Sequence, residues 1–282
     1  MPEDIRIGVD IGAVTIGLAV LKDGELISKS YRFHRGDIRK ALGEIFPPLD
    51  FSQARLAFTG RGAKTIDAKR RINDIVAAVE GVKWSAQRTP RYILLAGGEN
   101  ISLIKLDEDG SYASHDVNTD CASGTGVFLD QQASRLGLGI EMLSELASRF
   151  EGSPPPIATR CAVFAKTDLI HSQQKGYSLA AIAAGLCEGV SLCLADNLIK
   201  DRDFDGDICM AGGVALNSRV VSALDKILHK KIDRLPHAEV IPAIGAALQA
   251  EESVVFQDLF DGNAFMSEEN LPLNPPLLLE KS

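Results

Sequence analysis

The stretch N-T-D-C-A-S-G-T-G-V-F-L, from Asn118 to Leu129, is the most informative part of the chain. Its Gly-Thr-Gly segment at residues 124–126 is followed directly by apolar residues at helical spacing, which predicts a helix that begins at this turn. The first N–H groups of a helix have no partner within it and lie at the positive end of its dipole, so they can bind phosphate. The same electrostatics stabilise a thiolate, which makes Cys121 a candidate metal ligand. The stretch therefore predicts a nucleotide site and a metal site next to each other.

The composition of the chain favours a globular protein of the cytoplasm. Of the 282 residues, 45% are hydrophobic, which is enough for a substantial core. The formal net charge of -8 argues against nucleic-acid binding, which needs clustered Lys and Arg. We find no apolar run close to the ~20 residues of a membrane helix and no signal-peptide pattern at the acidic N-terminus, so we expect no membrane partner. Five cysteines are an odd, sparse set for disulfides and indicate metal or thiol chemistry in a reducing compartment.

The chain repeats one unit made of a strand, a glycine turn, a second strand and a hairpin. The first unit begins with the apolar strand of residues 6–9, and its hairpin turns at Gly24. The second begins with residues 92–96 and turns at Gly110. Two hairpins with Asp-Gly turns can look alike without a duplication, so that alternative stays open. We expect an α/β fold in which two such lobes face each other across a cleft.

The predicted lobes divide the chain near its first third. We expect an N-terminal lobe over residues 1–90 and a C-terminal lobe over residues 91–252. Residues 253–282 are acidic and Pro-rich, as in a tail or linker. Helical spacing predicts helices over residues 37–46, 73–82, 127–136, 140–150, 161–174, 178–199, 214–228 and 242–250.

The five cysteines fall into two groups. Cys121 and Cys161 each stand at the start of a predicted helix. Cys187 and Cys193 are six residues apart on one predicted helix, so they point to different faces and cannot bind one ion together. Cys209 lies in an apolar strand, where a free cysteine is usually a small buried hydrophobic residue. The first two are therefore the candidate metal ligands.

Two reactive cysteines are too few for an iron–sulfur cluster with four thiolate ligands. A symmetric dimer doubles the number, because each surface meets its own copy across the twofold axis. A cluster on that axis, held by Cys121 and Cys161 of both subunits, satisfies the count. Two ordinary partly buried thiols, or a redox disulfide, are the alternatives.

Three motifs carry a resemblance to a known family: N-T-D-C-A-S-G-T-G-V-F-L-D, C-A-V-F-A-K-T-D-L-I and M-A-G-G-V-A-L-N. From about Ile5 to Ala250 the chain resembles the ATP-dependent activators of 2-hydroxyacyl-CoA dehydratases, a family that includes ATPase subunits of benzoyl-CoA reductase. The first two motifs are specific because each contains a cysteine. The glycine motifs alone indicate only the actin–hexokinase–chaperone superfamily.

The resemblance implies two ribonuclease-H-like lobes with ATP between them. It implies a homodimer that bridges one four-iron four-sulfur (4Fe-4S) cluster through two cysteines per subunit, which here are Cys121 and Cys161. In such a protein ATP hydrolysis drives a low-potential electron into a partner acyl-CoA dehydratase or reductase. A ferredoxin or flavodoxin would be the electron donor.

The resemblance also assigns the nucleotide site. Asp10 would hold Mg²⁺ directly or through water and would form the first phosphate loop with Gly12, where Thr15 is the nearest hydroxyl. The other assigned positions are Gly97 and Gly98 in the second phosphate loop, Gly124, Thr125 and Gly126 between cluster and nucleotide, and Gly212, Gly213 and Asn217 near the adenosine.

The chain departs from the family pattern at both phosphate loops. The family usually has Ser or Thr after the first Asp-x-Gly, and this chain has Ala13-Val14. The second loop usually begins with an aspartate, and Leu95 stands there instead. These changes therefore argue more against ATP hydrolysis than against the cluster. Glu99 and Asp168 are the candidate replacement carboxylates.

Two other functions stay open. One is a small-molecule kinase of the same superfamily, which would need a catalytic carboxylate near the second loop. Leu95 speaks against it. The other is a regulatory domain that binds nucleotide or cluster without hydrolysis, as part of a longer polypeptide. The altered phosphate loops and the linker-like residues 253–282 motivate it.

Overall fold

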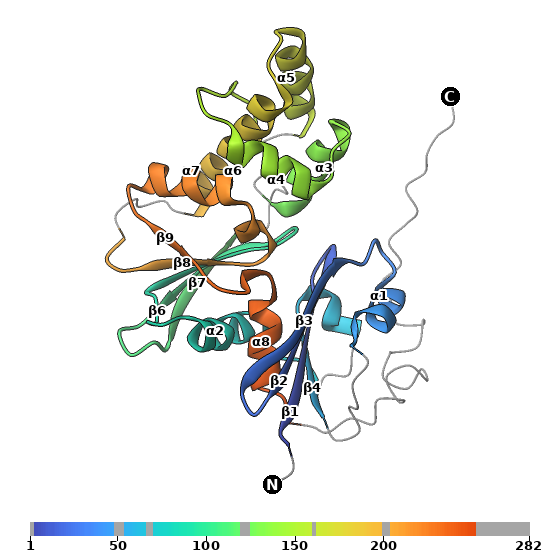
Figure 1. Ribbon diagram of the computed structural model, residues 1–282. Helices are drawn as coiled ribbons and strands as arrows, with labels where there is room; N and C mark the ends of the chain where they lie inside the picture. The colour runs from blue at the N-terminus through green and yellow to red at the C-terminus, as the bar shows by residue number, and fades with distance from the viewer. Residues whose placement is uncertain are drawn as a thin grey trace.

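The structure is a computed structural model that describes residues 3–47, 54–65, 70–118, 125–159, 162–198 and 204–251. Within these ranges the chain forms two β-sheets with helices around them (Figure 1). Three predicted site residues, Cys121, Gly124 and Cys161, lie outside the described residues, as does the predicted tail over residues 253–282.

The first sheet has four strands in the order β3-β2-β1-β4. The strands are β1 (Ile5–Ile11), β2 (Thr15–Lys22), β3 (Glu25–Phe33) and β4 (Arg55–Thr59). β1 is antiparallel to β2 and parallel to β4, and β2 is antiparallel to β3. Asp23 and Gly24 both have positive φ, as a two-residue turn between β2 and β3 requires, so the hairpin predicted at Gly24 is confirmed.

The second sheet repeats this arrangement and adds one strand, in the order β7-β6-β5-β8-β9. The strands are β5 (Tyr92–Ala96), β6 (Ile101–Leu106), β7 (Tyr112–Asn118), β8 (Ile208–Ala211) and β9 (Ile232–Arg234). β5 is antiparallel to β6 and parallel to β8, as β1 is to β2 and β4. The two sheets share strand order and the direction of each corresponding pairing, which confirms the predicted two-lobed α/β fold.

Most helices begin and end near their predicted bounds. They are α1 (Ile38–Ile45), α2 (Asp74–Ser85), α3 (Gly126–Arg135), α4 (Ile140–Arg149), α5 (Ala162–Gln174), α6 (Leu179–Leu198), α7 (Ser218–Leu228) and α8 (Ile241–Leu248), with short 3-10 segments η1 (Arg61–Thr65), η3 (Gly213–Leu216) and η4 (Ala238–Val240). The single helix predicted over residues 214–228 is wrong, because Asn217 separates η3 from α7. Its side chain accepts hydrogen bonds from the N–H groups of Arg219 and Val220, as an N-cap does.

Helix α8 packs backbone to backbone against β1 and α2. A Cβ atom at Gly8 would lie 1.8 Å from the carbonyl oxygen of Ala243, and one at Gly245 would lie 1.7 Å from that of Ala77. Only glycine fits at these two positions, as we expected for the Ala- and Gly-rich residues 242–250. A helix from the C-terminal part of the chain therefore covers the first sheet, and the predicted lobe bounds stay a prediction.

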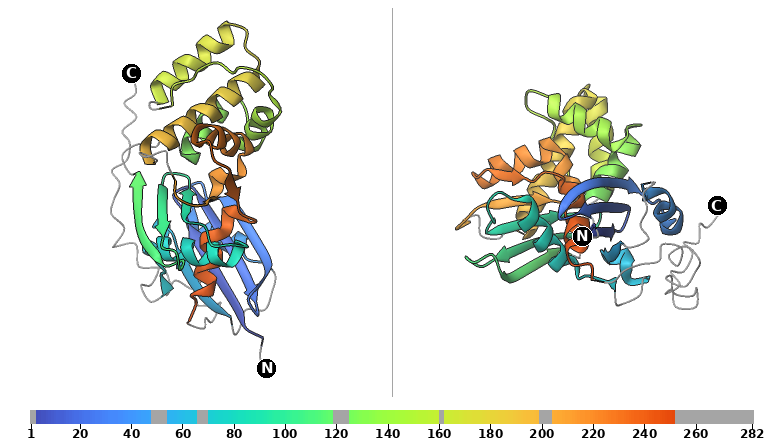
Figure 2. Two further views of the ribbon diagram at one scale, coloured as in Figure 1. Left: turned by 90° about the vertical axis from the view of Figure 1, so that its left-hand side faces the viewer. Right: turned by 60° about the horizontal axis from the view of Figure 1, so that its bottom comes forward.

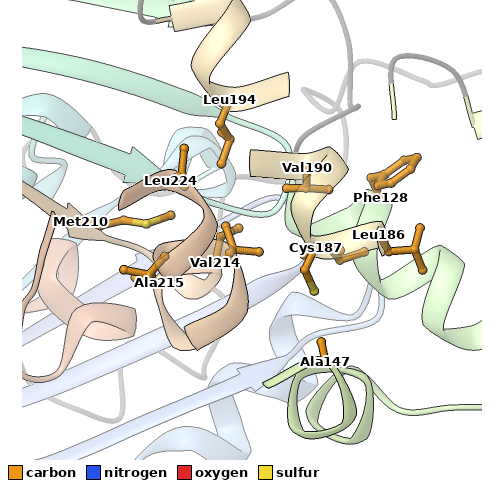
Figure 3. Packing of buried hydrophobic residues seen from close by; sticks show 14 of the residues in the cluster. Phe128, Ala147, Leu186, Cys187, Val190, Leu194, Met210, Val214, Ala215 and Leu224 are labelled. Atoms are coloured by element: carbon orange, nitrogen blue, oxygen red, sulfur yellow. The ribbon is translucent and has the colours of Figure 1, made fainter. Parts of the chain in front are cut away.

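Helices α3 to α6 lie at the end of the molecule opposite the N-terminus (Figure 2). Their core centres on α6, where Cys187 and Val190 pack among buried side chains of neighbouring helices that include Phe128 and Ala147 (Figure 3). The window Leu179–Asp196 of α6 is long and apolar enough to cross a membrane, which corrects our expectation that no run comes close. However, 67% of this window is buried inside the protein, as in the core helix of a globular domain.

Candidate functional site

A cavity of about 1060 Å³ lies between the two lobes. The first lobe contributes the β1–β2 loop, β3 and α1, and the second contributes the β5–β6 loop, α3, α4 and η3. The volume is at the upper end of the range for pockets that bind small molecules. Several residues predicted from separate motifs line this one cavity: Thr15, Gly97, Gly98, Gly126, Gly213 and Asn217.

The two predicted phosphate loops have the same backbone geometry. In each, the glycine N–H donates to the carbonyl oxygen three residues on, at 2.9 Å from Gly12 and at 2.8 Å from Gly97. The loops also approach each other, because a Cβ atom at Gly98 would lie 2.6 Å from Val14 Cγ2. Glycine at residue 98 therefore keeps the second loop clear of the first.

The start of α3 differs from the prediction. We expected unpaired N–H groups there, but the N–H of Gly126 donates to the carbonyl oxygen of Gly97 at 3.0 Å, and that of Val127 donates to Gly98 at 2.9 Å. The prediction is wrong for these two groups, because the second phosphate loop packs directly against the helix start and accepts their hydrogen bonds. Thr125, the N-cap residue, is fully buried. The contact holds the loop and α3 together as one unit.

Asp10 lies near the carboxyl end of β1, opposite Thr59 of the parallel strand β4. Burial raises the pKa of Asp10 to about 7, and the nearby carboxylate of Asp74 adds to the shift. The Oγ1 atom of Thr59 is buried without a hydrogen-bond partner in the described part of the chain. A disfavoured carboxylate charge beside an unpartnered hydroxyl oxygen fits a hard divalent cation such as Mg²⁺, which takes oxygen ligands.

Leu95 is the counterpart of Asp10 in the second lobe. Each lies two residues before the loop glycine, on a central strand that pairs with a parallel neighbour. The second lobe therefore offers an apolar side chain where the first offers a carboxylate. Glu99 is exposed and does not line the cavity. Asp168 does not line it either, and its Oδ2 accepts a hydrogen bond from the N–H of Ala158 at 2.8 Å. Catalytic roles for these two carboxylates stay predictions.

The wall near the predicted adenosine position follows β8. Gly212 has a φ of +92°, and a Cβ atom there would lie 2.3 Å from the carbonyl oxygen of Ala96. Gly213 faces Tyr31 of β3, whose hydroxyl would lie 2.3 Å from a Cβ atom at residue 213. The same hydroxyl accepts a hydrogen bond from Thr15 Oγ1 at 3.1 Å.

Tyr31 thus touches both lobes, and the sequence analysis missed it. It lies on an alternating strand whose pattern has no feature that marks this residue. Desolvation by burial raises the pKa of its hydroxyl. A phenol is protonated at neutral pH even without this shift, so the hydroxyl can donate a hydrogen bond.

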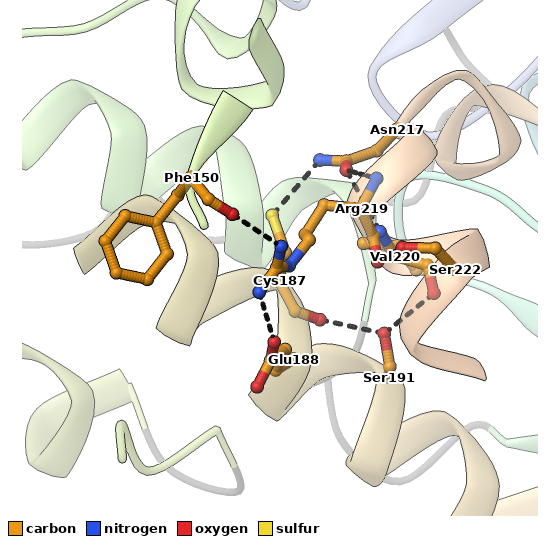
Figure 4. A network of polar contacts seen from close by, with 8 residues as sticks. All are labelled: Phe150, Cys187, Glu188, Ser191, Asn217, Arg219, Val220 and Ser222. Carbon is orange, nitrogen blue, oxygen red and sulfur yellow. Dashed lines mark hydrogen bonds and ion pairs between the residues drawn. The ribbon is translucent and has the colours of Figure 1, made fainter. Parts of the chain in front are cut away.

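Asn217 links the cavity to the helical layer (Figure 4). Besides capping α7, it donates a hydrogen bond from Nδ2 to Cys187 Sγ on α6 at 3.3 Å. Arg219 continues the network, with Nη2 bonded to Glu188 of α6 at 2.5 Å and Nη1 bonded to the carbonyl oxygen of Phe150 after α4 at 3.0 Å. The predicted adenosine residue is therefore also the connection from η3 to α6.

The cysteines expected to be structural are buried. Cys187, Cys193 and Cys209 are free thiols with at most 2% exposure, and burial raises the pKa of both Cys187 and Cys209 to about 12. They are inert under ordinary conditions. Across the described ranges no three His, Cys, Asp or Glu side chains are grouped to hold a metal ion. The two predicted ligands, Cys121 and Cys161, lie outside those ranges.

The first turn of α5 exposes two large apolar side chains. Val163 is 70% exposed and Phe164 is 66% exposed. They lie two and three residues after Cys161 in the sequence. Exposed apolar side chains at adjacent positions are typical of a surface that another protein covers.

Comparison with known proteins identifies relatives over most of the chain. The model of the BadF/BadG/BcrA/BcrD ATPase family matches residues 7–250. The activator of lactoyl-CoA dehydratase from Anaerotignum propionicum is 29% identical over 255 residues, which cover 88% of this chain and 97% of that protein.

Two solved structures are similar in fold. The activator of the 2-hydroxyisocaproyl-CoA dehydratase from Clostridium difficile with bound ADPNP has a TM-score of 0.78 and 24% identity, covering 87% of this chain and 94% of that one. Component A of the (R)-2-hydroxyglutaryl-CoA dehydratase from Acidaminococcus fermentans has a TM-score of 0.76 and 26% identity, covering 88% and 97%. The resemblance and the fold inferred from the sequence are confirmed.

Proposed function

Because the chain belongs to the BadF/BadG/BcrA/BcrD ATPase family, we propose that it is an ATP-dependent activator that donates one electron to an acyl-CoA dehydratase or reductase. The observation that carries the proposal is the convergence of both glycine loops, the start of α3 and Asn217 on one interlobe cavity. The relatives named above are activators of such dehydratases.

The cleft is proposed to bind ATP. The loops at Gly12 and Gly97 would contact the phosphates from the two lobes, and Gly213 and Asn217 would contact the adenosine. Since only ATP has a γ-phosphate that reaches both loops, ATP favours a closed cleft more than ADP does. Tyr31 supports this coupling, because its hydroxyl already contacts Thr15 of the first loop and approaches Gly213 of the second lobe.

Asp10 is proposed to hold Mg²⁺, with Thr59 beside it. The ion neutralises charge on the phosphates when bound. The carboxylate is then kept in its charged form, although burial alone raises its pKa to about 7. Asp10 would also orient the attacking water, since Leu95 offers no group for that task.

The proposed cluster site uses Cys121 and Cys161 of two copies of the chain. The 4Fe-4S cluster supplies one-electron chemistry at low potential when bound, and a ferredoxin or flavodoxin would reduce it. The exposed Val163 and Phe164 support a contact between copies next to this site, because two such surfaces would bury each other across a twofold axis. Asn217 and Arg219 connect the adenosine wall to α6 and α4, which carry movement of the lobes toward α5.

Anaerobic purification tests the electron-donor function. We expect a brown dimer with one cluster per two chains, and loss of colour, iron and sulfide in Cys121→Ala and Cys161→Ala. Cys193→Ala, which changes a buried thiol of α6, is the matched control and should keep the cluster. A colourless monomer with full ATPase activity would rule the proposal out.

A second function is favoured by Leu95. Without a carboxylate in the second lobe, the cleft would bind nucleotide and change conformation without cleaving it, as a regulatory domain does. Phosphate release measured under saturating ATP and Mg²⁺ separates the two. Release that Asp10→Asn abolishes, with ADPNP still bound, supports the ATPase. Tight ADPNP binding without any release by the wild type supports the regulatory domain.

A further inference from the structure

A second cavity, of about 370 Å³, lies in the first lobe at the carboxyl end of β4. It adjoins Asp10 of β1, because a Cβ atom at Gly60 on its wall would lie 2.3 Å from Asp10 Oδ1. The residues that line it are Gly60, Arg61, Ala63, Lys64, Arg71, Ile72, Asn73 and Asp74. None of the residues predicted from the sequence to bind nucleotide belongs to it.

This wall is the first-lobe copy of the wall that lines the interlobe cavity. After β4, Gly60 has a φ of +87° and η1 follows; after β8, Gly212 has a φ of +92° and η3 follows. In the first lobe the Asn73 side chain then caps α2 with hydrogen bonds of 2.9 and 3.3 Å, as Asn217 caps α7. The duplication has therefore produced two walls of one design, and the second lobe uses its own at the nucleotide cavity.

The charges in the second cavity are unbalanced. Arg61, Lys64 and Arg71 bring three positive charges and Asp74 brings one negative charge, in a chain whose net charge is -8. Among the described residues, none of the three cations has a recorded ion pair. All three are exposed, so they can reach a ligand without breaking a contact of the fold. Guanidinium and ammonium groups around a small concave site are the donors that tetrahedral oxyanions prefer.

We infer that this second cavity is an oxyanion site that takes inorganic phosphate, separate from the nucleotide cavity. The source of this phosphate rests on the proposed function, since ATP hydrolysis beside Asp10 would release phosphate at the edge of this cavity. Binding itself does not depend on hydrolysis. The three cations of the wall attract the anion and outnumber Asp74, the one acidic side chain that lines the same cavity.

Calorimetric titration of inorganic phosphate into the full chain tests the site. The chain is first saturated with ADPNP and Mg²⁺, so that the interlobe cavity is filled. We expect one phosphate per chain, with affinity lowered about tenfold or more in Lys64→Ala and in Arg71→Ala, since each removes a charge-assisted hydrogen bond. Arg234→Ala and Lys226→Ala, which change exposed cations outside both cavities, should bind as the wild type does.

Two further titrations identify the ligand. Sulfate should compete with phosphate, because it has the same shape. AMP added after ADPNP should not compete with phosphate, because we expect the second cavity to bind free phosphate and not a phosphate group attached to a nucleoside. Loss of phosphate binding on ADPNP saturation, equal affinity in Lys64→Ala and wild type, or binding of AMP alone would each overturn the inference. If the wild-type protein binds phosphate but has neither a cluster nor ATPase activity, the proposed function is refuted and the phosphate site is still supported.

Discussion

Replacing Asp10 by asparagine should stabilise the protein at pH 8 without divalent cations, although it removes the proposed Mg²⁺ ligand. The pKa of Asp10 is raised from 3.8 to about 7 by burial, with a smaller contribution from Asp74. Between these two values the folded state keeps a proton that the unfolded state has already lost. Stability therefore falls as pH rises through this window and stays lowered above it. Asparagine has nearly the same shape and does not ionise, so the variant escapes this loss.

The size of the effect follows from the shift of the pKa. Each unit corresponds to about 1.4 kcal/mol, so the full shift sets an upper limit of about 4 kcal/mol. Asp10 is partly exposed, and solvent screening lowers the expected gain to ~2 kcal/mol at pH 8. At pH 4 the gain should nearly vanish, because both forms are then largely neutral. Saturating Mg²⁺ should reverse the sign, since the ion stabilises only the protein whose carboxylate it binds.

Urea unfolding of the wild type and Asp10→Asn at pH 4, 6 and 8 in EDTA measures this difference. Glu108→Gln, which changes an exposed carboxylate of the β6–β7 hairpin, is the control and should show no such trend. Two results would contradict this reasoning: a parallel loss of stability of Asp10→Asn and the wild type between pH 4 and 8, or a lower free energy of unfolding for the variant at pH 8 without metal. Either would mean that the folded state does not raise the pKa of Asp10.

Other substitutions test the cleft, the cap and the exposed face of α5. Gly98→Ala brings a methyl group against Val14 and should weaken ADPNP binding about tenfold. The methyl group of Gly97→Ala meets its nearest atom only at 3.4 Å, so this variant should weaken ADPNP binding less. Fluorescence titration with ADPNP compares the two variants. Asn217→Ala removes the cap of α7 and should cost about 1 kcal/mol or more in urea unfolding, and an unchanged midpoint would contradict the capping role. Phe164→Ser should shift the protein toward monomer in sedimentation without lowering its melting temperature, because the side chain is exposed.

The sequence predicted what short-range patterns encode. Alternating and apolar runs located the central strands, and the glycines at residues 12 and 97 located both loops, because each turn is formed by neighbouring residues. The repeat of strand order was predictable because the two hairpins use the same Asp-Gly turn.

What the sequence did not predict depends on contacts between distant segments. The first N–H groups of α3 bond to Gly97 and Gly98, which lie almost thirty residues earlier. Tyr31 contacts Thr15 on its own sheet and approaches Gly213 across the cleft, and no local pattern marks such a residue. The break before α7 could have been predicted from the sequence, since an asparagine followed by serine is a common helix start. The second cavity could be recognised only from the folded repeat, because its cations are spread over residues 61–71.

Helix α8 has a consequence for the order of synthesis. It is made last among the described elements, yet it covers β1, which is made first. Until residue 248 has left the ribosome, the nascent N-terminal sheet has an uncovered apolar face where Gly8 will meet Ala243. The first lobe therefore cannot mature ahead of the second, and both must complete folding together after translation has passed α8.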